Sequence, residues 1–302
     1  MNYLKKRKAM DGFICGLMIF SSAMIGAALL GIIAYILIQS AGMVNLSLLF
    51  GAPGESLVPM IVSTAWIVLV SLSIALPVGI MTAIYLHEYA GKSGFSRILG
   101  LAIDTLAGIP SIIYGLFGLL AFCRFFKLGQ SVIAGGFTLT IMILPVIIRT
   151  TEEALKTVPD SFREGSYSLG ATKFQTIVHV VLPPALPGIL AAAILAIGRI
   201  VGESAPVLLT VGLALNLPKT IFEPGRTLTI HLFYLTKEAV KPDDFAKAFT
   251  AAAVLIILVL IINTAVKIIG RSFGKSGENI TNGRRKTTGQ EFVPFLRGNS
   301  GP

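Results

Sequence analysis

The chain has 302 residues, of which 54% are hydrophobic and 13% charged, and its mean hydropathy is +0.81. Soluble domains contain about 25% charged residues, so this composition excludes an ordinary soluble domain and, with its long apolar runs, predicts an all-α membrane domain. The two cysteines exclude a disulfide framework, and the three histidines lie too far apart in sequence for metal-ligand spacing.

Six apolar segments along the chain are long enough to cross a bilayer as helices. The first is much longer than the apolar part of a signal peptide, which is about 7–15 residues, so we expect an uncleaved helix. Residues 1–11 precede this transmembrane domain at 12–269, and the aperiodic tail at 270–302, native or partly added for expression, is predicted to be disordered. The expected spans are residues 12–38, 59–86, 98–122, 130–148, 185–213 and 245–269.

Lysine and arginine residues indicate which loops face the cytoplasm. With the N-terminus inside, the cytoplasmic segments and the adjoining end of the sixth span carry 17 of them, against 7 in the external segments. Because cytoplasmic loops of membrane proteins are enriched in these residues, both termini are predicted to be cytoplasmic. The net charge of +10 is thus explained by topology, and nucleic-acid binding is not expected.

The third span contains the sequence GIPSIIYGLFG at residues 108–118, in which glycines and a proline interrupt the helix. A broken helix is tolerated at membrane depth where it lines a cavity or is buried in protein, whereas small residues also allow ordinary close packing. Both interpretations stay open. Asp104 in this span and Arg149 at the end of the fourth lie at similar depths, so we expect them to pair, as a structural ion pair or in a cytoplasmic gate.

The polar segment at residues 151–184, called the bracket below, separates the fourth and fifth spans. A helix start is predicted at Thr151, and Pro159 and Asp160 suit the first turn of the helix that follows. Gly170 is expected to end that helix, because glycine readily adopts the left-handed conformation found after helix C-termini.

A second short helix is predicted in the bracket after this glycine. Thr172 and Gln175 have the spacing of a capping box, in which each satisfies a backbone N–H of the other at the helix start. Pro183 and Pro184 are expected to end this helix, because the residue before a proline avoids the helical conformation. The bracket is therefore predicted to be two short helices joined at a glycine.

Arg199 and Glu203 lie near the middle of the fifth span. Each would cost about 2.5–3.5 kcal/mol at the bilayer centre, so such residues usually face the bundle interior or a water-filled path. Four residues apart, they share a helix face and form either a structural ion pair or part of an anion pathway. In a pathway, the planar donors of Arg199 suit phosphate oxygens, and Glu203 accepts the hydroxyl of hydrogen phosphate, with Ser204 beside it.

The bracket resembles the EAA signature of ABC importer permeases, in which Glu-Ala-Ala is followed at fixed spacing by Gly and Leu-Pro. In that family this segment is a coupling helix that docks on a cytoplasmic ATPase, which implies the same role here for the segment that begins at Arg163. Gly165 and Ser166 replace the two alanines and Val180 replaces isoleucine, and the first two leave room for a docking surface. The matching positions are Glu164, Gly165, Ser166, Gly170, Val180, Leu182 and Pro183.

Three further segments resemble the phosphate importer permeases of the PstA type, at residues 108–118, 144–159 and 198–210. Together with the bracket they cover most of the chain between about residues 60 and 210, and the rest agrees only in hydropathy. The sister PstC type shares the Gly-Ile-Pro-Ser and EAA features. The Arg-Thr-Thr-Glu-Glu and Gly-Glu-Ser-Ala-Pro runs favour the PstA type.

The resemblance implies a six-helix permease with the type I ABC importer fold that moves inorganic phosphate into the cytoplasm by alternating access. It implies a second homologous permease, a cytoplasmic ATPase dimer that uses ATP and magnesium, and an extracytoplasmic phosphate-binding protein, all at the inner membrane of a prokaryote. No cofactor and no enzymatic activity are expected in this chain, which lacks a Gly-x-x-x-x-Gly-Lys-Ser/Thr loop for nucleotide phosphates.

Three other functions remain as rivals at this point. The same machine could carry another oxyanion such as sulfate or molybdate. An ion-coupled secondary transporter would not need a docking bracket. A membrane-embedded hydrolase built on Ser204 would lack a histidine within an apolar span to activate it.

Overall fold

The computed structural model describes residues 2–41, 56–91, 93–239 and 242–288, and every regular element in these ranges is helical. Most of the segment at residues 39–58, between the first two expected spans, and the last residues of the tail lie outside this described part. The α-helices are α1 (Asn2–Ala41), α3 (Val58–Ile84), α4 (Gly94–Ala107), α5 (Ser111–Gly118), α6 (Val132–Lys156), α7 (Asp160–Ser168), α8 (Lys173–Thr176), α9 (Leu182–Gly202), α10 (Ala205–Thr210), α11 (Leu228–Glu238) and α12 (Pro242–Thr288). Three π-helical segments are η1 (Tyr85–Tyr89), η2 (Leu119–Phe125) and η3 (Ile177–Val181).

Within the described residues, five helical segments are long and apolar enough to cross a membrane, and a sixth crossing results if α4 and α5 with η2 count as one bent span. The expected first, second, fourth and sixth spans correspond to α1, α3 with η1, α6 and α12. The all-α membrane architecture predicted from composition and apolar runs is confirmed.

The chain divides into two compact units. The first comprises residues 1–58 and 231–257 and thus holds α1 and the first part of α12. In this unit the rings of Tyr35 and Phe249 meet edge to face, with centroids 5.6 Å apart. Apolar side chains of α1 are exposed on successive residues, and the helix is long and apolar enough to cross a membrane.

The second unit comprises residues 59–230 and 258–302 and has α6 at its centre. The most apolar stretch of α6 is 67% buried, and α6 packs most extensively against α9. Because lipid is as apolar as the side chains themselves, helices in membranes associate through close packing of small residues. A Cβ added to Gly188 of α9 would lie only 2.4 Å from the Cβ of Ala154 in α6, so the two helices are nearly in backbone contact.

Helix α3 approaches α6 closely at two places. A Cβ on Gly136 of α6 would lie 2.4 Å from Val70, and one on Gly79 of α3 would lie 2.6 Å from Ile147. At the first of these contacts, the Ser71 hydroxyl donates a hydrogen bond of 3.2 Å to the Gly136 carbonyl. The two helices therefore touch at these glycines and are joined there by a hydrogen bond.

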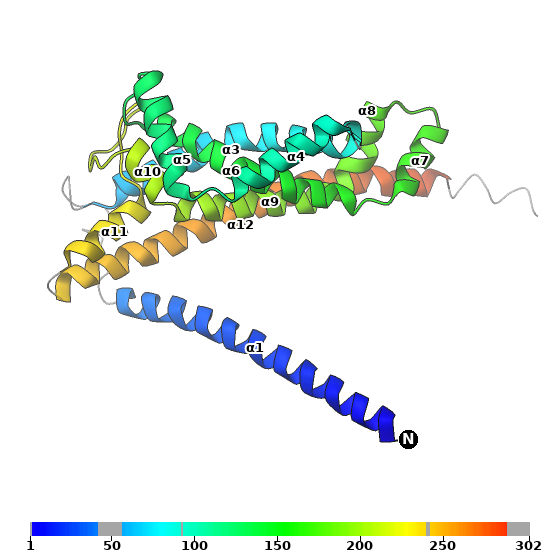
Figure 1. The fold of residues 1–302 in the computed structure, drawn as a ribbon, viewed down its shortest axis with the longest axis horizontal. Coiled ribbons are helices and arrows are strands. Elements are labelled where there is room, and N and C mark those ends of the chain that lie inside the picture. Colours follow the sequence, from blue (N-terminus) through cyan, green and yellow to red (C-terminus); the bar gives the residue numbers. More distant parts are fainter. Residues whose placement is uncertain (1, 42–55, 92, 240–241, 289–302) are drawn as a thin grey trace, which may run out of the picture. The chain divides into compact units, whose positions relative to one another are not determined.

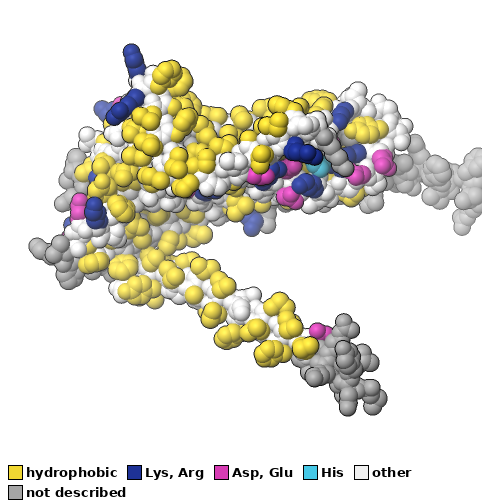
Figure 2. Space-filling model, in the orientation of Figure 1, with side chains coloured by type: hydrophobic (Ala, Val, Ile, Leu, Met, Phe, Trp, Pro, Cys, Tyr) yellow, Lys and Arg dark blue, Asp and Glu magenta, His cyan; other side chains and the backbone are white. Residues whose placement is uncertain are grey.

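Figure 1 shows α7 and α8 at one end of the helices of the second unit and α5 and α10 at the other. Hydrophobic side chains cover much of the surface visible in Figure 2, and several charged side chains gather near α7 and α8. The bracket therefore lies at one end of the bundle, and the broken parts of the third and fifth spans lie at the opposite end.

Several predicted element boundaries are wrong. Helix α6 continues to Lys156 without a new start at Thr151, because no glycine or proline follows the apolar part to stop it. Pro183 and Pro184 do not end a helix but lie in the first turn of α9, where the missing N–H has no helical acceptor to lose. The polar loop expected between the fifth and sixth spans contains an 11-residue helix, α11.

The helix of the sixth span also extends further than expected. The sequence predicts a disordered tail from residue 270, whereas α12 runs to Thr288. Extending an existing helix adds one hydrogen bond for each residue fixed, so a helix propagates more easily than it starts. Residues 289–302 of the predicted tail lie outside the described part of the chain.

Candidate functional site

Pro110 breaks the third predicted span. Proline lacks a backbone N–H and its ring clashes with the carbonyl four residues earlier, so α4 ends before it and α5 continues at an angle of 100°. The carbonyl that loses its helical partner belongs to Leu106, and it accepts a hydrogen bond of 2.6 Å from the Tyr114 hydroxyl. The predicted interruption of this helix is confirmed, and α5 supplies the group that satisfies it.

Helix α9 is interrupted in the same way by Pro206. This proline cannot donate to the carbonyl of Gly202, so α9 ends there and α10 begins as a separate short helix. Glu203 closes α9 with an extended backbone, at a ψ of 131°, and Ser204 is the last residue before α10. The fifth span expected at residues 185–213 is therefore divided between α9 and α10.

Glycines allow the two interrupted spans to pack together. A Cβ on Gly115 of α5 would lie 2.7 Å from the Cα of Pro206 in α10. A Cβ on Gly118 would lie 2.1 Å from the Oγ1 of Thr138 in α6. Of the two interpretations of residues 108–118, close packing applies to these two glycines, while the helix break lies before them.

Arg199 and Glu203 pair across the end of α9, with Nε and Oε1 3.7 Å apart. Their pairing was predicted, but the shared helical face was wrong because Glu203 lies outside the helix. Arg199 is in the last turn, where the helix dipole favours a positive charge. Among the described residues Arg199 makes no hydrogen bond, and 34% of its side chain is exposed, so its donors are available to a ligand.

Tyr114 lies at the break in the third span and is buried, at 4% exposure. The site thus combines a guanidinium with available donors, a carboxylate that is 17% exposed, and the backbone break at Ser204. Such a set can bind an oxyanion through Arg199 and accept a proton-bearing hydroxyl at Glu203.

Asp104 and Arg149 form the predicted pair, with Nη2 of the arginine 2.7 Å from Oδ1. Arg149 also contacts Glu152 at 2.7 Å and donates a hydrogen bond of 2.9 Å to the Gly100 carbonyl. These bonds tie α4 to α6 and engage the donors of Arg149 within the protein. Whether the pair acts as a gate stays a prediction.

The predicted arrangement of two helices joined at a glycine is present in α7 and α8, but α8 is not a separate short helix, because it continues through η3 into α9. Helix α7 ends before Gly170, whose φ of +82° lies in the left-handed region that glycine adopts without strain. The capping box of α8 is complete, since Thr172 and Gln175 each accept a hydrogen bond from the backbone N–H of the other, at 3.3 and 2.9 Å. The hydroxyls of Ser166 and Thr176 lie 2.9 Å apart and connect the two helices.

The outer surface of the bracket combines polar groups with exposed apolar side chains. Leu169 is 90% exposed and Phe162 52%, although both are large apolar residues. A Cβ on Gly165 would meet no atom within 4 Å, so the predicted open side of α7 is present. Of the residues predicted for coupling, Glu164, Gly165, Gly170 and Pro183 are exposed, Ser166 and Leu182 are half-buried, and Arg163 is buried.

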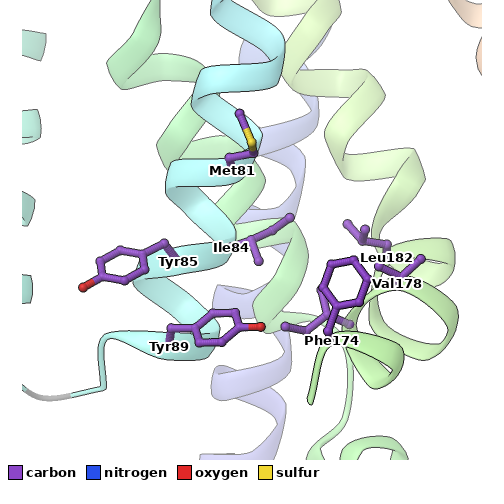
Figure 3. Close-up of a pocket in the computed structure, with 8 residues that line it drawn as sticks. Met81, Ile84, Tyr85, Tyr89, Phe174, Val178 and Leu182 are labelled. Atoms are coloured by element: carbon purple, nitrogen blue, oxygen red, sulfur yellow. The ribbon is translucent and has the colours of Figure 1, made fainter. Parts of the chain in front are cut away.

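A groove of about 430 Å³ lies between the bracket and the end of α3 with η1. The lining is almost entirely apolar, and Figure 3 shows Tyr89 reaching toward Phe174 across it. The Nζ of Lys173 lies 4.7 Å from the centre of the Tyr89 ring, a cation–π contact between α8 and η1. The groove is lined by Met81, Ile84, Tyr85, Tyr89, Phe174, Ile177, Val178 and Leu182.

Sequence reasoning did not single out Glu88 or Tyr114. Glu88 is the only acidic residue between residues 59 and 103, and a lone carboxylate at the end of an apolar span signals a buried partner. Its partner, Arg163, is 75 residues away, so no local pattern could identify it. Tyr114 could have been found from its position, because it follows Pro110 closely in sequence and its hydroxyl can bond the Leu106 carbonyl that Pro110 leaves without a helical partner.

Residues 75–275 match the model of the family described as binding-protein-dependent transport system inner membrane component. The chain is 32% identical over 282 residues to the probable ABC transporter permease protein YqgI of Bacillus subtilis, covering 87% of this chain and 96% of the relative. It is 41% identical over 198 residues to phosphate transport system permease protein PstA 1 of Mycobacterium tuberculosis (65% of this chain, 64% of the relative) and so spans slightly less than two thirds of that protein. For PstA of Yersinia pestis the identity is 36% over 222 residues, with 72% of each chain covered.

Solved ABC transporters share the fold. A chain of the methionine ABC transporter MetNI in an inward-facing conformation aligns with a TM-score of 0.56 and 24% identity, covering 72% of this chain and 93% of that one. A chain of a bacterial alginate ABC transporter, solved in complex with an alginate-bound periplasmic protein, aligns with a TM-score of 0.62 and 15% identity, covering 90% and 96%. At these identities the likeness concerns the fold alone.

Proposed function

The chain belongs to the family of binding-protein-dependent transport system inner membrane components, and from this premise we propose that it is the permease subunit of an ATP-driven importer of inorganic phosphate. It is a multi-pass membrane permease of an ABC transporter. Relatives named as phosphate permeases, at 36–41% identity over 198 to 222 residues, support phosphate as the transported ion.

The observation that carries the proposal is the difference between three arginines of the second unit. The guanidinium groups of Arg149 and Arg163 donate hydrogen bonds to acceptors in the protein and thereby connect helices. Arg199 makes one loose ion pair and no hydrogen bond within the described residues, although it lies among interrupted helices. A guanidinium with available donors at membrane depth is suited to receive an oxyanion.

Glu203 favours hydrogen phosphate over other oxyanions at this site. Its carboxylate repels a fully deprotonated anion such as sulfate or molybdate, but accepts a hydrogen bond from the hydroxyl of hydrogen phosphate. An importer of one of those oxyanions is the alternative function, and it requires that Glu203 be neutral or turned away during transport.

The bracket is the proposed docking surface for a cytoplasmic ATPase. Exposed apolar side chains at Leu169 and Phe162, beside the open side of Gly165, fit a partner that covers α7. ATP and magnesium would act on that partner dimer, and this chain would hydrolyse nothing. A second homologous permease and an extracytoplasmic phosphate-binding protein complete the proposed complex, with both termini of this chain in the cytoplasm and the protein in the inner membrane.

Phosphate uptake per assembled complex, in vesicles that contain all subunits, tests the proposal. Arg199→Ala should lower uptake sharply, because the anion loses both the positive charge and the forked donors. Arg199→Lys should restore only part of it, since the charge remains but the planar fork is lost. Arg124→Ala serves as the control, because Arg124 is an exposed arginine at the end of η2.

Selectivity separates phosphate from its rivals in the same vesicles. Labelled phosphate, sulfate and molybdate are offered to the parent and to Glu203→Gln, which keeps size and hydrogen bonding but removes the repulsion. The parent should prefer phosphate, and the variant should gain sulfate uptake relative to phosphate. Parent-like uptake per complex in all three variants would leave Arg199 and Glu203 as a structural pair, and preference for sulfate in the parent would replace phosphate as the substrate.

A further inference from the structure

Arg163 is the most heavily engaged side chain in the bracket. Its Nε and Nη2 donate to Glu88 Oε1 at 3.1 and 2.9 Å, and its Nη1 donates to Asp160 at 3.0 Å. Nη1 also donates to the Val158 carbonyl at 2.7 Å, and Nη2 donates to the Leu155 carbonyl at 3.2 Å. Each of the three guanidinium nitrogens therefore has acceptors inside the protein, and none is left for an outside partner.

These acceptors come from different elements. The carbonyls lie at the end of α6 and just beyond it, Asp160 starts α7, and Glu88 belongs to η1. The Arg163 side chain is 11% exposed and that of Glu88 only 5%, so this ion pair is shielded from water. A shielded pair with full hydrogen bonding holds its geometry more firmly than an exposed one, because water does not compete for the two charges.

Glu88 connects its ion pair with Arg163 to a long helix. Segment η1 continues α3 without a break, since Ile84 before it is itself helical. Helix α3 touches α6 at Gly136 and at Gly79, and toward its other end the Thr64 hydroxyl accepts a hydrogen bond of 3.0 Å from the backbone N–H of Leu228. If Glu88 moves, α3 and η1 are therefore expected to move with it, because they form one continuous helical element in the second unit.

We propose that the buried pair of Arg163 and Glu88 is the joint through which movement of the bracket reaches the membrane helices. This rests on the proposed function, in which an ATPase moves the bracket. The neighbouring Glu164 and Gly165 are exposed and open to that partner, whereas Arg163 is a positioning residue that acts inward. Without the joint, α7 follows the ATPase while α3 does not, so ATP is hydrolysed without transport.

The test compares transported phosphate per ATP hydrolysed, in vesicles holding the complete complex. Glu88→Gln removes the charge at nearly constant shape, and Arg163→Lys keeps the charge but cannot reach all of its acceptors. The paired variant Glu88→Met with Arg163→Met leaves no unpaired buried charge, so it should assemble better than the single variants. The matched control is Glu153→Gln with Lys156→Met, which removes an exposed ion pair of 2.7 Å within α6 that joins no separate elements.

The three joint variants should lower phosphate transported per ATP by about two- to thirtyfold, the usual range for disrupted coupling between sites, and the control should keep the parent ratio. The paired variant distinguishes a positioning role from a purely stabilising one. It should assemble like the parent, but it should still transport less phosphate per ATP hydrolysed. A parent-like ratio in the paired variant, or losses confined to the amount of assembled complex, would overturn the proposal.

A second measurement is independent of the transported ion. A fluorophore on Met81→Cys, an exposed position of α3, is placed in a chain whose native Cys15 and Cys123 are replaced by serine. ATP should change its emission in the parent and not in Arg163→Lys. An ATP response that persists unchanged in Arg163→Lys overturns the joint, whereas a parent that responds to ATP but carries no phosphate overturns the proposed substrate and leaves the joint standing.

Discussion

The Tyr114 hydroxyl donates a 2.6 Å hydrogen bond to the carbonyl of Leu106, across the helix break between α4 and α5. Pro110 creates the unpaired carbonyl, and the tyrosine eight residues further on satisfies it while remaining 4% exposed. The hydrogen bond therefore stabilises the sharp bend between the two helices.

The first prediction concerns this hydrogen bond. Tyr114→Phe removes the donor and keeps the ring, so it should lower the free energy of unfolding by about 1 kcal/mol, as for one buried hydrogen bond. Thermal unfolding of the purified chain in lipid nanodiscs measures the change. Tyr35→Phe is the control, because it removes a hydroxyl from a half-exposed tyrosine outside the break; equal effects of the two changes would contradict a special role for Tyr114.

The glycines between α5 and α6 should not tolerate a methyl group. A Cβ on Gly118 would lie 2.1 Å from Thr138 Oγ1 and 2.8 Å from Thr210 Cγ2, so Gly118→Ala should destabilise the fold by about 1–3 kcal/mol through overpacking. Gly198→Ala in α9 is the matched change, because a Cβ added there would meet no atom within 4 Å. It should stabilise its helix by about 0.5–1 kcal/mol. Midpoints of thermal unfolding compare them, and similar shifts for both would argue against the close helix contact.

The acidic partners of Arg149 should contribute unequally. The side chain of Asp104 is 62% exposed, whereas that of Glu152 is 15% exposed. Asp104→Asn should therefore change stability by about 0–1 kcal/mol, and Glu152→Gln by more, because the ion pair with Glu152 is better shielded from water. If Asp104→Asn alters phosphate uptake while its unfolding midpoint stays at the parent value, the pair acts in gating; unchanged uptake identifies it as structural.

The open side of α7 should tolerate a small side chain but not a large one. Gly165→Ala adds a Cβ where no atom lies within 4 Å and should support normal uptake. Gly165→Arg should still insert into the membrane, because the site lies outside the apolar spans, but it should uncouple uptake from ATP hydrolysis by obstructing the docked ATPase. Normal uptake together with normal ATPase association in Gly165→Arg would remove the coupling role of this face.

Local sequence signals predicted local structure well. The capping box of Thr172 and Gln175, the left-handed Gly170 and the break at Pro110 were all expected, because each depends on bonds between residues a few positions apart. Proline was the ambiguous signal. Pro183 starts a helix instead of ending one, since a proline is compatible with the first turn of a helix and excluded only from its interior.

The sequence by itself determined that this is an all-α membrane protein with a two-helix bracket, because hydropathy, helix caps and turn glycines act over a few residues. Only the tertiary structure decided which charged side chains form ion pairs within the protein. Arg149 and Asp104 are 45 residues apart, and Arg163 and Glu88 are 75 residues apart. Such pairs depend on which helices pack together and at what depth their ends meet. For that reason Arg163, predicted as an outward coupling residue, lies buried against Glu88, while Arg199 retains donors for a ligand.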